Sequence, residues 1–211
     1  MTHPILPPLY VVTDRHQVGE EKFLETLSQM MSCGGFMLQL REKDLSTRGL
    51  VSLAQTVRSL AALHHVPLLI NDRLDVSMVV GAAGVHLRSD SLPVKQARQC
   101  LGPDALIGVS VHSVEETRSC EDAGADFVVL GPIFDTPSKR SYGTPLGLQA
   151  LQEARATCQI PIYAIGGITL DRVEAVKEAG AYGVAVISAI WCAQYPSQAV
   201  KYFTTHLGVP K

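Results

Sequence analysis

The sequence has few cysteines, few aromatic residues and almost no excess of charge of either sign. Its 211 residues include five cysteines without a C-x-x-C pair, which indicates neither a disulfide framework nor a zinc site. The formal net charge is −2, so the chain has no overall electrostatic attraction to nucleic acid or to an anionic membrane. We therefore expect a cytoplasmic protein with reduced thiols that binds neither nucleic acid nor membrane.

Long hydrophobic runs are also absent. The longest apolar runs, such as residues 183–191, are too short to cross a bilayer. The segment Met1–Pro4 has no basic stretch followed by an apolar one, so we expect no signal peptide. Hydrophobic residues nonetheless make up 46% of the chain, which predicts a large apolar core in a single domain over residues 1–211.

Short runs rich in Val, Ile and Leu alternate with helix-length segments. The eight runs are residues 9–14, 36–41, 67–72, 84–87, 106–111, 127–131, 161–166 and 183–188. Nearly continuous apolar character is typical of parallel strands buried on both faces. Eight such units predict an α/β fold, a closed (β/α)8 TIM barrel. The alternative is an open doubly wound sheet, but its usual glycine-rich turn is missing from Val12–Arg15, after the first run.

Active sites of such barrels lie at the carboxyl ends of the strands. The second run carries Gln39, Arg41 and Lys43 at alternate positions, which places all three side chains on one side. An amide and two cations at a barrel mouth suit an anionic ligand, whereas the alternative is a strand that runs out into a solvated turn. The third run ends in Asn71-Asp72, where Asp72 is suited either to hold Mg²⁺ or to cap the next helix.

The fifth run and the loop after the sixth supply further polar residues. Ser110 and His112 share a face at the end of the fifth run, although a lone histidine is more often structural. The long loop at residues 135–146 carries Lys139 and Arg140, two adjacent cations that could close over a ligand. The predicted mouth therefore collects residues from several strands.

Small residues at the ends of the last two runs give the firmest indication of a phosphate site. Gly166-Gly167 joins the seventh run to its helix, and Ile187-Ser188 occupies the same place one unit later. Glycine allows backbone N–H groups to approach a phosphate, and a helix N-terminus adds a favourable dipole. Phosphate sites after strands 7 and 8 recur in barrels. The alternative is a pair of tight turns that only require small residues.

Together these segments resemble the thiamine phosphate synthase / thiazole tautomerase family, in order through essentially the whole chain. The segments that carry the resemblance are Leu9–Asp14, Gln39–Lys43, Asn71-Asp72, Gly84–Leu87, Gly108–Ser110, Gly131-Pro132, Thr136 with Lys139, Ile165–Ile168 and Val186–Ile190. The resemblance implies a barrel enzyme of thiamine biosynthesis that acts on a thiazole phosphate. It also implies that Ser110 and Thr136 contact substrate.

In a synthase of this family, a pyrimidine pyrophosphate ionises and the nitrogen of a thiazole phosphate attacks the carbon centre. The resemblance implies that Mg²⁺ would be held by Asp72 and that the departing pyrophosphate would be held by Arg41, Lys43, Asn71 and Lys139. The synthase pattern His-Leu-Gly-Gln-x-Asp supplies a second Mg²⁺-binding Asp.

That second carboxylate is displaced in this sequence. Ser91 stands where the Asp belongs, Asp90 lies one residue away, and Arg88-Ser89 replaces Gly-Gln. One carboxylate holds Mg²⁺ poorly against a pyrophosphate charge, which weakens the synthase interpretation.

A tautomerase of this family needs no metal and shifts a proton to aromatise a carboxythiazole phosphate. The resemblance places its histidine at His112, although synthases also tend to carry one there, and Arg88 would suit the substrate carboxylate. Against the tautomerase, Gln39, Lys43 and Asn71-Asp72 keep the synthase-like form.

We therefore expect a thiazole tautomerase, an isomerase without a cofactor, in which His112 is the catalytic residue and the substrate is a phosphorylated small molecule. The alternative is a thiamine phosphate synthase, a transferase that uses Mg²⁺. A third interpretation is a non-catalytic, phosphate-binding regulatory barrel. The sequence leaves open whether the protein forms a homo-oligomer.

Overall fold

In the computed structural model, described over residues 5–136 and 144–209, parallel strands close into one barrel in chain order. The strands are β1 (Leu9–Val12), β2 (Phe36–Leu40), β3 (Leu68–Asn71), β4 (Gly84–Leu87), β5 (Leu106–Val111), β6 (Phe127–Leu130), β7 (Ile162–Ile165) and β8 (Gly183–Val186). The barrel closes where β1 pairs with β8, with Leu9 opposite Val184. This architecture confirms the predicted α/β fold and the (β/α)8 barrel.

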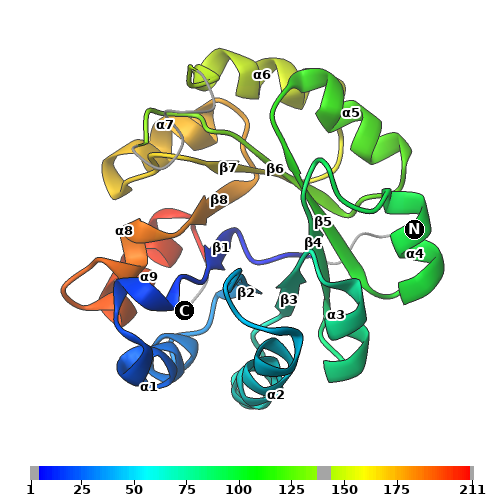
Figure 1. The fold of residues 1–211 in the computed structure, drawn as a ribbon. Helices are drawn as coiled ribbons and strands as arrows, with labels where there is room; N and C mark the ends of the chain where they lie inside the picture. The colour runs from blue at the N-terminus through cyan, green and yellow to red at the C-terminus, as the bar shows by residue number, and fades with distance from the viewer. Residues whose placement is uncertain (1–4, 137–143, 210–211) are drawn as a thin grey trace.

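Helices follow the strands and surround the barrel (Figure 1). They are α1 (Glu20–Met31), α2 (Thr47–Leu63), α3 (Leu74–Val80), α4 (Val94–Leu101), α5 (Val114–Asp122), α6 (Gly147–Thr157), α7 (Val173–Glu178), α8 (Ser188–Trp191) and α9 (Pro196–His206). Single 3₁₀ turns, η1 (Arg15–Gln17) and η3 (Leu170–Arg172), precede α1 and α7. Within the described ranges, none of the helices is long and apolar enough to cross a membrane.

Each strand serves two apolar cores, because successive side chains point to opposite faces. Leu9 and Val11 of β1 belong to the outer core between barrel and helices, whereas Tyr10 belongs to the barrel interior. Burial on both sides explains why the strands read as continuous apolar runs and not as alternating ones.

Four aromatic rings fill the barrel interior. The Tyr10 ring lies 5.5 Å from Phe127, 5.9 Å from Tyr163 and 5.6 Å from His86, measured between centroids. Gly108 faces the same space, and a Cβ there would lie 2.2 Å from the Phe127 Cζ atom, so this position requires glycine. The interior is therefore packed, and chemistry is left to the strand ends.

Candidate functional site

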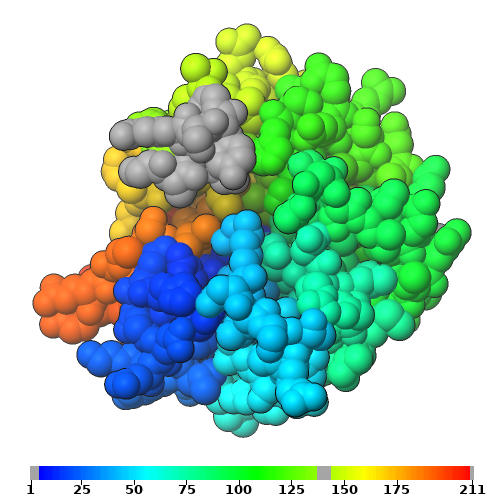
Figure 2. All heavy atoms as spheres, in the orientation of Figure 1, coloured from blue at the N-terminus to red at the C-terminus, as the bar shows by residue number. Residues whose placement is uncertain are grey.

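The segments after β1 and β2 are joined by a buried network of polar side chains. Glu42 accepts hydrogen bonds from the Thr13 hydroxyl at 2.6 Å and from the Arg15 guanidinium at 3.0 Å. Arg15 and Glu42 are both buried. The Thr13 oxygen also accepts a hydrogen bond from the backbone N–H of Arg41 at 2.9 Å. The two segments accordingly lie side by side in the space-filling view, in dark and light blue (Figure 2).

This network positions the predicted residues of β2. Arg41 is half-buried, and its charge contributes to lowering the pKa of the buried His86. Gln39 is buried, and its side-chain amide donates a hydrogen bond to the Tyr10 hydroxyl at 3.0 Å. Lys43 is exposed. The structure therefore brings Gln39 and Arg41 to the interior side of the mouth and leaves Lys43 at its outer edge.

Asp72 stands directly after β3 in a constrained backbone conformation. Its φ of 59° lies in the left-handed region, which non-glycine residues rarely adopt, although Asp tolerates it better than most. Its N–H donates to the carbonyl of His86 at 2.8 Å. The Asp72 Oδ1 atom is buried and has no hydrogen-bond partner among the described residues. A buried carboxylate oxygen without a partner suits a divalent cation, so Asp72 fits Mg²⁺.

The neighbouring acid, Asp90, is held by an arginine. Arg88 donates to both Asp90 oxygens, at 2.9 and 2.8 Å, and its Nε lies 3.6 Å from Asp72 Oδ2. The Asp90 side chain is 72% exposed. Asn71, predicted to bind pyrophosphate, ends β3 and is half-buried beside Asp72. Asp72 is thus the better metal candidate of the two acids.

Ser110, on β5, contacts a buried histidine that the sequence did not single out. The Ser110 Oγ lies 2.9 Å from His86 Nε2, and the His86 Nδ1 is buried without a partner in the described part of the chain. Burial, and secondarily the charge of Arg41, lower the pKa of His86 to about 3. His86 is therefore neutral at physiological pH and acts as a hydrogen-bonding group, not as a charge.

His112 lies at the end of β5 and is exposed. Its Nδ1 is 2.7 Å from the carbonyl oxygen of Gly131, which makes Nδ1 the protonated nitrogen because a carbonyl only accepts. Thr136 is half-buried in the loop after β6, and Lys139 lies outside the described residues. His112 is therefore tied to the loop after β6.

The predicted phosphate turn after β7 packs tightly against the loop after β6. Gly166 and Gly167 have φ values of 95° and 63°, which favour glycine. A Cβ on Gly166 would lie 2.6 Å from Pro132 Cβ, and one on Gly167 would lie 2.8 Å from Phe134 Cβ. Arg172 donates to the Gly167 carbonyl at 2.6 Å. Packing thus explains the two glycines, and a phosphate role for them stays a prediction.

The second half of the predicted phosphate site begins a short helix. Ile187 precedes α8, and Ser188 is its first residue, where a helix N–H has no acceptor within the helix. Trp191, in the same helix, donates from its indole N–H to the carbonyl of Val12 at 2.8 Å. α8 is therefore anchored to the end of β1, beside the barrel mouth.

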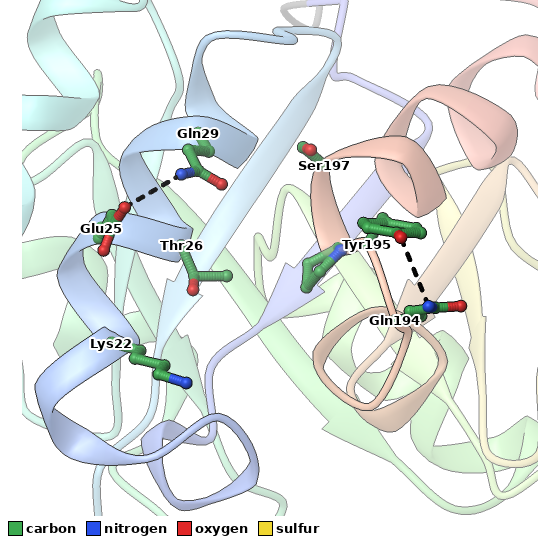
Figure 3. A pocket seen from close by; sticks show the side chains of 8 residues that line it. Lys22, Glu25, Thr26, Gln29, Gln194, Tyr195 and Ser197 are labelled. Atoms are coloured by element: carbon green, nitrogen blue, oxygen red, sulfur yellow. Dashed lines mark hydrogen bonds between the residues drawn. The ribbon is translucent and has the colours of Figure 1, made fainter.

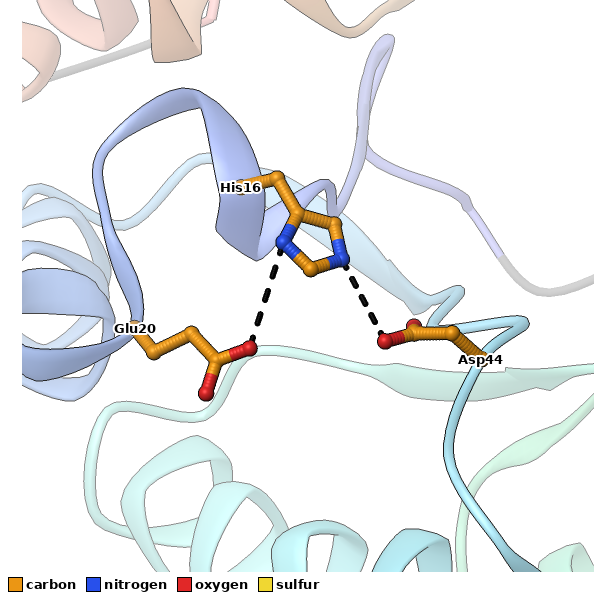
Figure 4. Close-up of side chains that lie close together, drawn as sticks. All are labelled: His16, Glu20 and Asp44. Carbon is orange, nitrogen blue, oxygen red and sulfur yellow. Dashed lines mark ion pairs between the residues drawn. The ribbon is translucent and has the colours of Figure 1, made fainter.

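A cluster with metal-binding residue types lies at the outer edge of the mouth. His16 lies 3.9 Å from Glu20 and 3.3 Å from Asp44 (Figure 4). Arg15 contacts the same two carboxylate oxygens, at 3.1 Å for Glu20 and in a short contact to Asp44. A guanidinium on both oxygens repels a metal ion, so the cluster is an extension of the Arg15–Glu42 network. Arg15 accordingly lowers the pKa of Asp44.

Two surface pockets lie elsewhere. One, of about 360 Å³, lies between α1 and the start of α9, with Lys22, Glu25 and Tyr195 in its lining (Figure 3). The other, of about 520 Å³, is lined in part by Ile5 and Tyr182. Neither is lined by a residue of the predicted site.

Arg15, Glu42 and His86 were not predicted to belong to the site. Alternation along the chain carried a signal for two of them. His86 alternates with Gly84 and Arg88, just as Gln39 alternates with Arg41. Glu42 lies between Arg41 and Lys43, so its side chain is expected on the opposite side from theirs.

Comparison with known proteins gives a consistent answer. The family model described as thiamine monophosphate synthase matches residues 9–190. A thiamine-phosphate synthase of Roseiflexus sp. (strain RS-1) is 42% identical over 92% of this chain and 82% of its own length. One of Desulfitobacterium hafniense (strain Y51) is 42% identical over 92% of this chain and 93% of its own length. A solved thiamine phosphate pyrophosphorylase from Pyrococcus furiosus has a TM-score of 0.86 and 32% identity, with 95% of each chain covered.

These relatives correct the expected activity. They are named as synthases or pyrophosphorylases, which are transferases, so the expectation of a thiazole tautomerase, an isomerase, was wrong. The expectation rested on Ser91 and Arg88, which stand where the family has an Asp and a Gly. The shifted acid suggested a lost metal site, whereas Asp72 alone still presents a buried carboxylate oxygen without a partner among the described residues.

Proposed function

Because the chain belongs to the thiamine monophosphate synthase family, we propose that it joins a pyrimidine pyrophosphate to a thiazole phosphate, releasing pyrophosphate. The observation that carries the proposal is 42% identity to a thiamine-phosphate synthase over 92% of the chain. The buried Asp72 oxygen supports it, since a leaving pyrophosphate calls for a divalent cation.

The chemistry determines what the residues have to do. The carbon–oxygen bond to pyrophosphate breaks and its electron pair leaves with the pyrophosphate. The lone pair of the thiazole nitrogen forms the new carbon–nitrogen bond, and the product carries a thiazolium charge. No proton is transferred in this exchange. The site therefore has to neutralise the leaving group and align two substrates, and it needs no general base.

Neutralisation falls to the cationic side of the mouth. Arg41 and Lys43 would bind the pyrophosphate oxygens, with Asn71 donating from its amide and Lys139 as a further predicted contact. Asp72 would hold Mg²⁺, which when bound neutralises pyrophosphate charge. The backbone N–H of Arg41 is held by the Thr13 hydroxyl, which would fix the point from which its side chain reaches the leaving group.

Alignment falls to the opposite side of the mouth and to the interior. Gly166, Gly167, Ile187 and Ser188 would bind the thiazole phosphate through backbone N–H groups. Gln39, Ser110 and Thr136 would contact the substrates through neutral polar atoms. The substrate is thus a small phosphorylated molecule. A cytoplasmic location and a homo-oligomeric state stay predictions.

The direct test is an assay of the purified protein with pyrimidine pyrophosphate, thiazole phosphate and Mg²⁺. Thiamine phosphate and pyrophosphate are expected in equal amounts, and omission of either substrate should abolish thiamine phosphate. Pyrophosphate release without thiamine phosphate, in the presence of both substrates, would show a hydrolase and refute the proposal.

His112 provides a separate test of the mechanism. His112→Ala is expected to lower kcat/KM by less than about tenfold, because loss of a required acid or base costs about 10²- to 10⁴-fold. Steady-state kinetics of thiamine phosphate formation measure the effect, with Arg41→Ala as the comparison that should fall much further. A loss of 10²-fold or more in His112→Ala would contradict a reaction without proton transfer.

A further inference from the structure

Arg88, the residue after β4, links two acids of the barrel mouth. Its guanidinium donates to both oxygens of Asp90, and its Nε lies 3.6 Å from Asp72 Oδ2. Arg88 and Asp90 are exposed, whereas Asp72 is half-buried and its Oδ1 has no partner among the described residues. A positively charged side chain therefore lies beside the carboxylate that fits Mg²⁺.

This arrangement has an electrostatic consequence. A divalent cation on Asp72 would compete with the nearby guanidinium for the same carboxylate. Asp90 offsets the charge of that guanidinium only in part, because Asp90 is 72% exposed and its charge is screened by solvent. Pyrophosphate carries several negative charges, so it attracts both cations and removes the repulsion between them. The pair between Arg88 and the 72% exposed Asp90 contributes little stability, so Arg88 is released from it easily.

We propose that Arg88 is a second, protein-borne cation of the leaving-group site, which opposes Mg²⁺ alone and binds pyrophosphate directly. The inference rests on the proposed function. Its consequence is that Mg²⁺ and pyrophosphate bind as a pair, each raising the affinity of the other, because such coupling is reciprocal. Arg88 thereby supplies part of the charge that a second metal-binding carboxylate would otherwise recruit.

The chain contains a matched control for Arg88. Arg73 also pairs with an acid two residues further on, Asp75, through its Nε at 2.9 Å and its terminal nitrogen at 2.5 Å. This pair is exposed as well, but Arg73 also donates to Thr47 at 3.1 Å, and within the described ranges no ion pair joins its guanidinium to the carboxylate of Asp72. Arg73→Gln therefore removes a similar arginine–aspartate pair without the proposed function.

The experiment is isothermal titration calorimetry of Arg88→Gln, Arg88→Lys, Arg73→Gln and the unaltered protein, with Mg²⁺ alone and with metal-free inorganic pyrophosphate. Arg88→Gln should bind Mg²⁺ alone about tenfold more tightly and pyrophosphate about tenfold more weakly. Arg88→Lys should keep most of the pyrophosphate affinity, and Arg73→Gln should change neither. Thermal melting checks that all variants are folded.

The proposed role of Arg88 is supported if the affinity for Mg²⁺ rises and the affinity for pyrophosphate falls, since general damage to the site lowers both affinities. Weakening of both ligands, or no change in either, would overturn the proposal. Turnover is measured separately. If the two affinities shift in opposite directions but the protein makes no thiamine phosphate, the role of Arg88 in binding pyrophosphate is supported and the proposed synthase function is refuted. If turnover is normal and the affinities do not shift in this way, only the proposed role of Arg88 is refuted.

Discussion

Asp72→Asn is expected to lower kcat/KM for thiamine phosphate formation by about 10²- to 10³-fold, the range found when one charge-stabilising group is removed from an active site. The substitution keeps the size of the side chain and removes the charge on a buried oxygen that has no partner among the described residues.

The measurement is steady-state kinetics over a range of Mg²⁺ concentrations. Asp75→Asn is the control, because Asp75 lies on α3 in an exposed pair with Arg73 and should leave kcat/KM unchanged. Asn tolerates positive φ as Asp does, so the melting temperature of Asp72→Asn should stay close to that of the unaltered protein. Near-normal activity and Mg²⁺ dependence in Asp72→Asn would show that Asp72 does not hold Mg²⁺.

Glu42→Ala is expected to destabilise the fold by about 3 kcal/mol, the lower end of the range for removing one partner of a buried ion pair. The lower end applies because Arg15 keeps Asp44 and Glu20 as partners. The variant also frees the Thr13 hydroxyl, which holds the backbone of Arg41, so kcat should fall along with stability. Denaturant unfolding measures the first effect and kinetics at low temperature measure the second.

Glu25→Ala is the matched control for this prediction. Glu25 is an exposed glutamate on α1 whose side chain accepts one long hydrogen bond, 3.4 Å from Gln29, and its removal should change stability by less than about 0.5 kcal/mol. Equal stability of Glu42→Ala and Glu25→Ala would mean that the buried network contributes nothing to the fold.

The barrel and the position of the site were accessible from the sequence because both follow from periodicity. Continuous apolar runs indicate strands buried on both faces, and alternate residues such as Gln39 and Arg41 necessarily share a side. The first run was expected to reach residue 14, whereas β1 ends at Val12 because Thr13 turns its hydroxyl to Glu42 and Arg41.

The activity was not accessible in the same way. The residues around 88–91 show which acids are present, but not that Arg88 is paired with Asp90 while Asp72 keeps a buried oxygen without a partner in the described ranges. Likewise, the sequence shows Glu42 only as one charged residue among several polar neighbours, and the structure is needed to show that it is buried together with Arg15. Such distinctions depend on distances between residues from different strands, which a single sequence does not contain.

The aromatic interior also determines how substrates enter the site and how products leave it. Tyr10, Phe127 and Tyr163 are fully buried and pack ring against ring, so the barrel has no passage from one end to the other. Under the proposed function, both substrates enter and both products leave through the same barrel mouth. Gln39 is buried whereas Lys43 is exposed at the outer edge of the barrel mouth. A substrate bound at Gln39 would therefore lie deeper than a substrate bound near Lys43. If one substrate binds at Gln39, we expect it to enter before the other, which predicts an ordered addition of the two substrates.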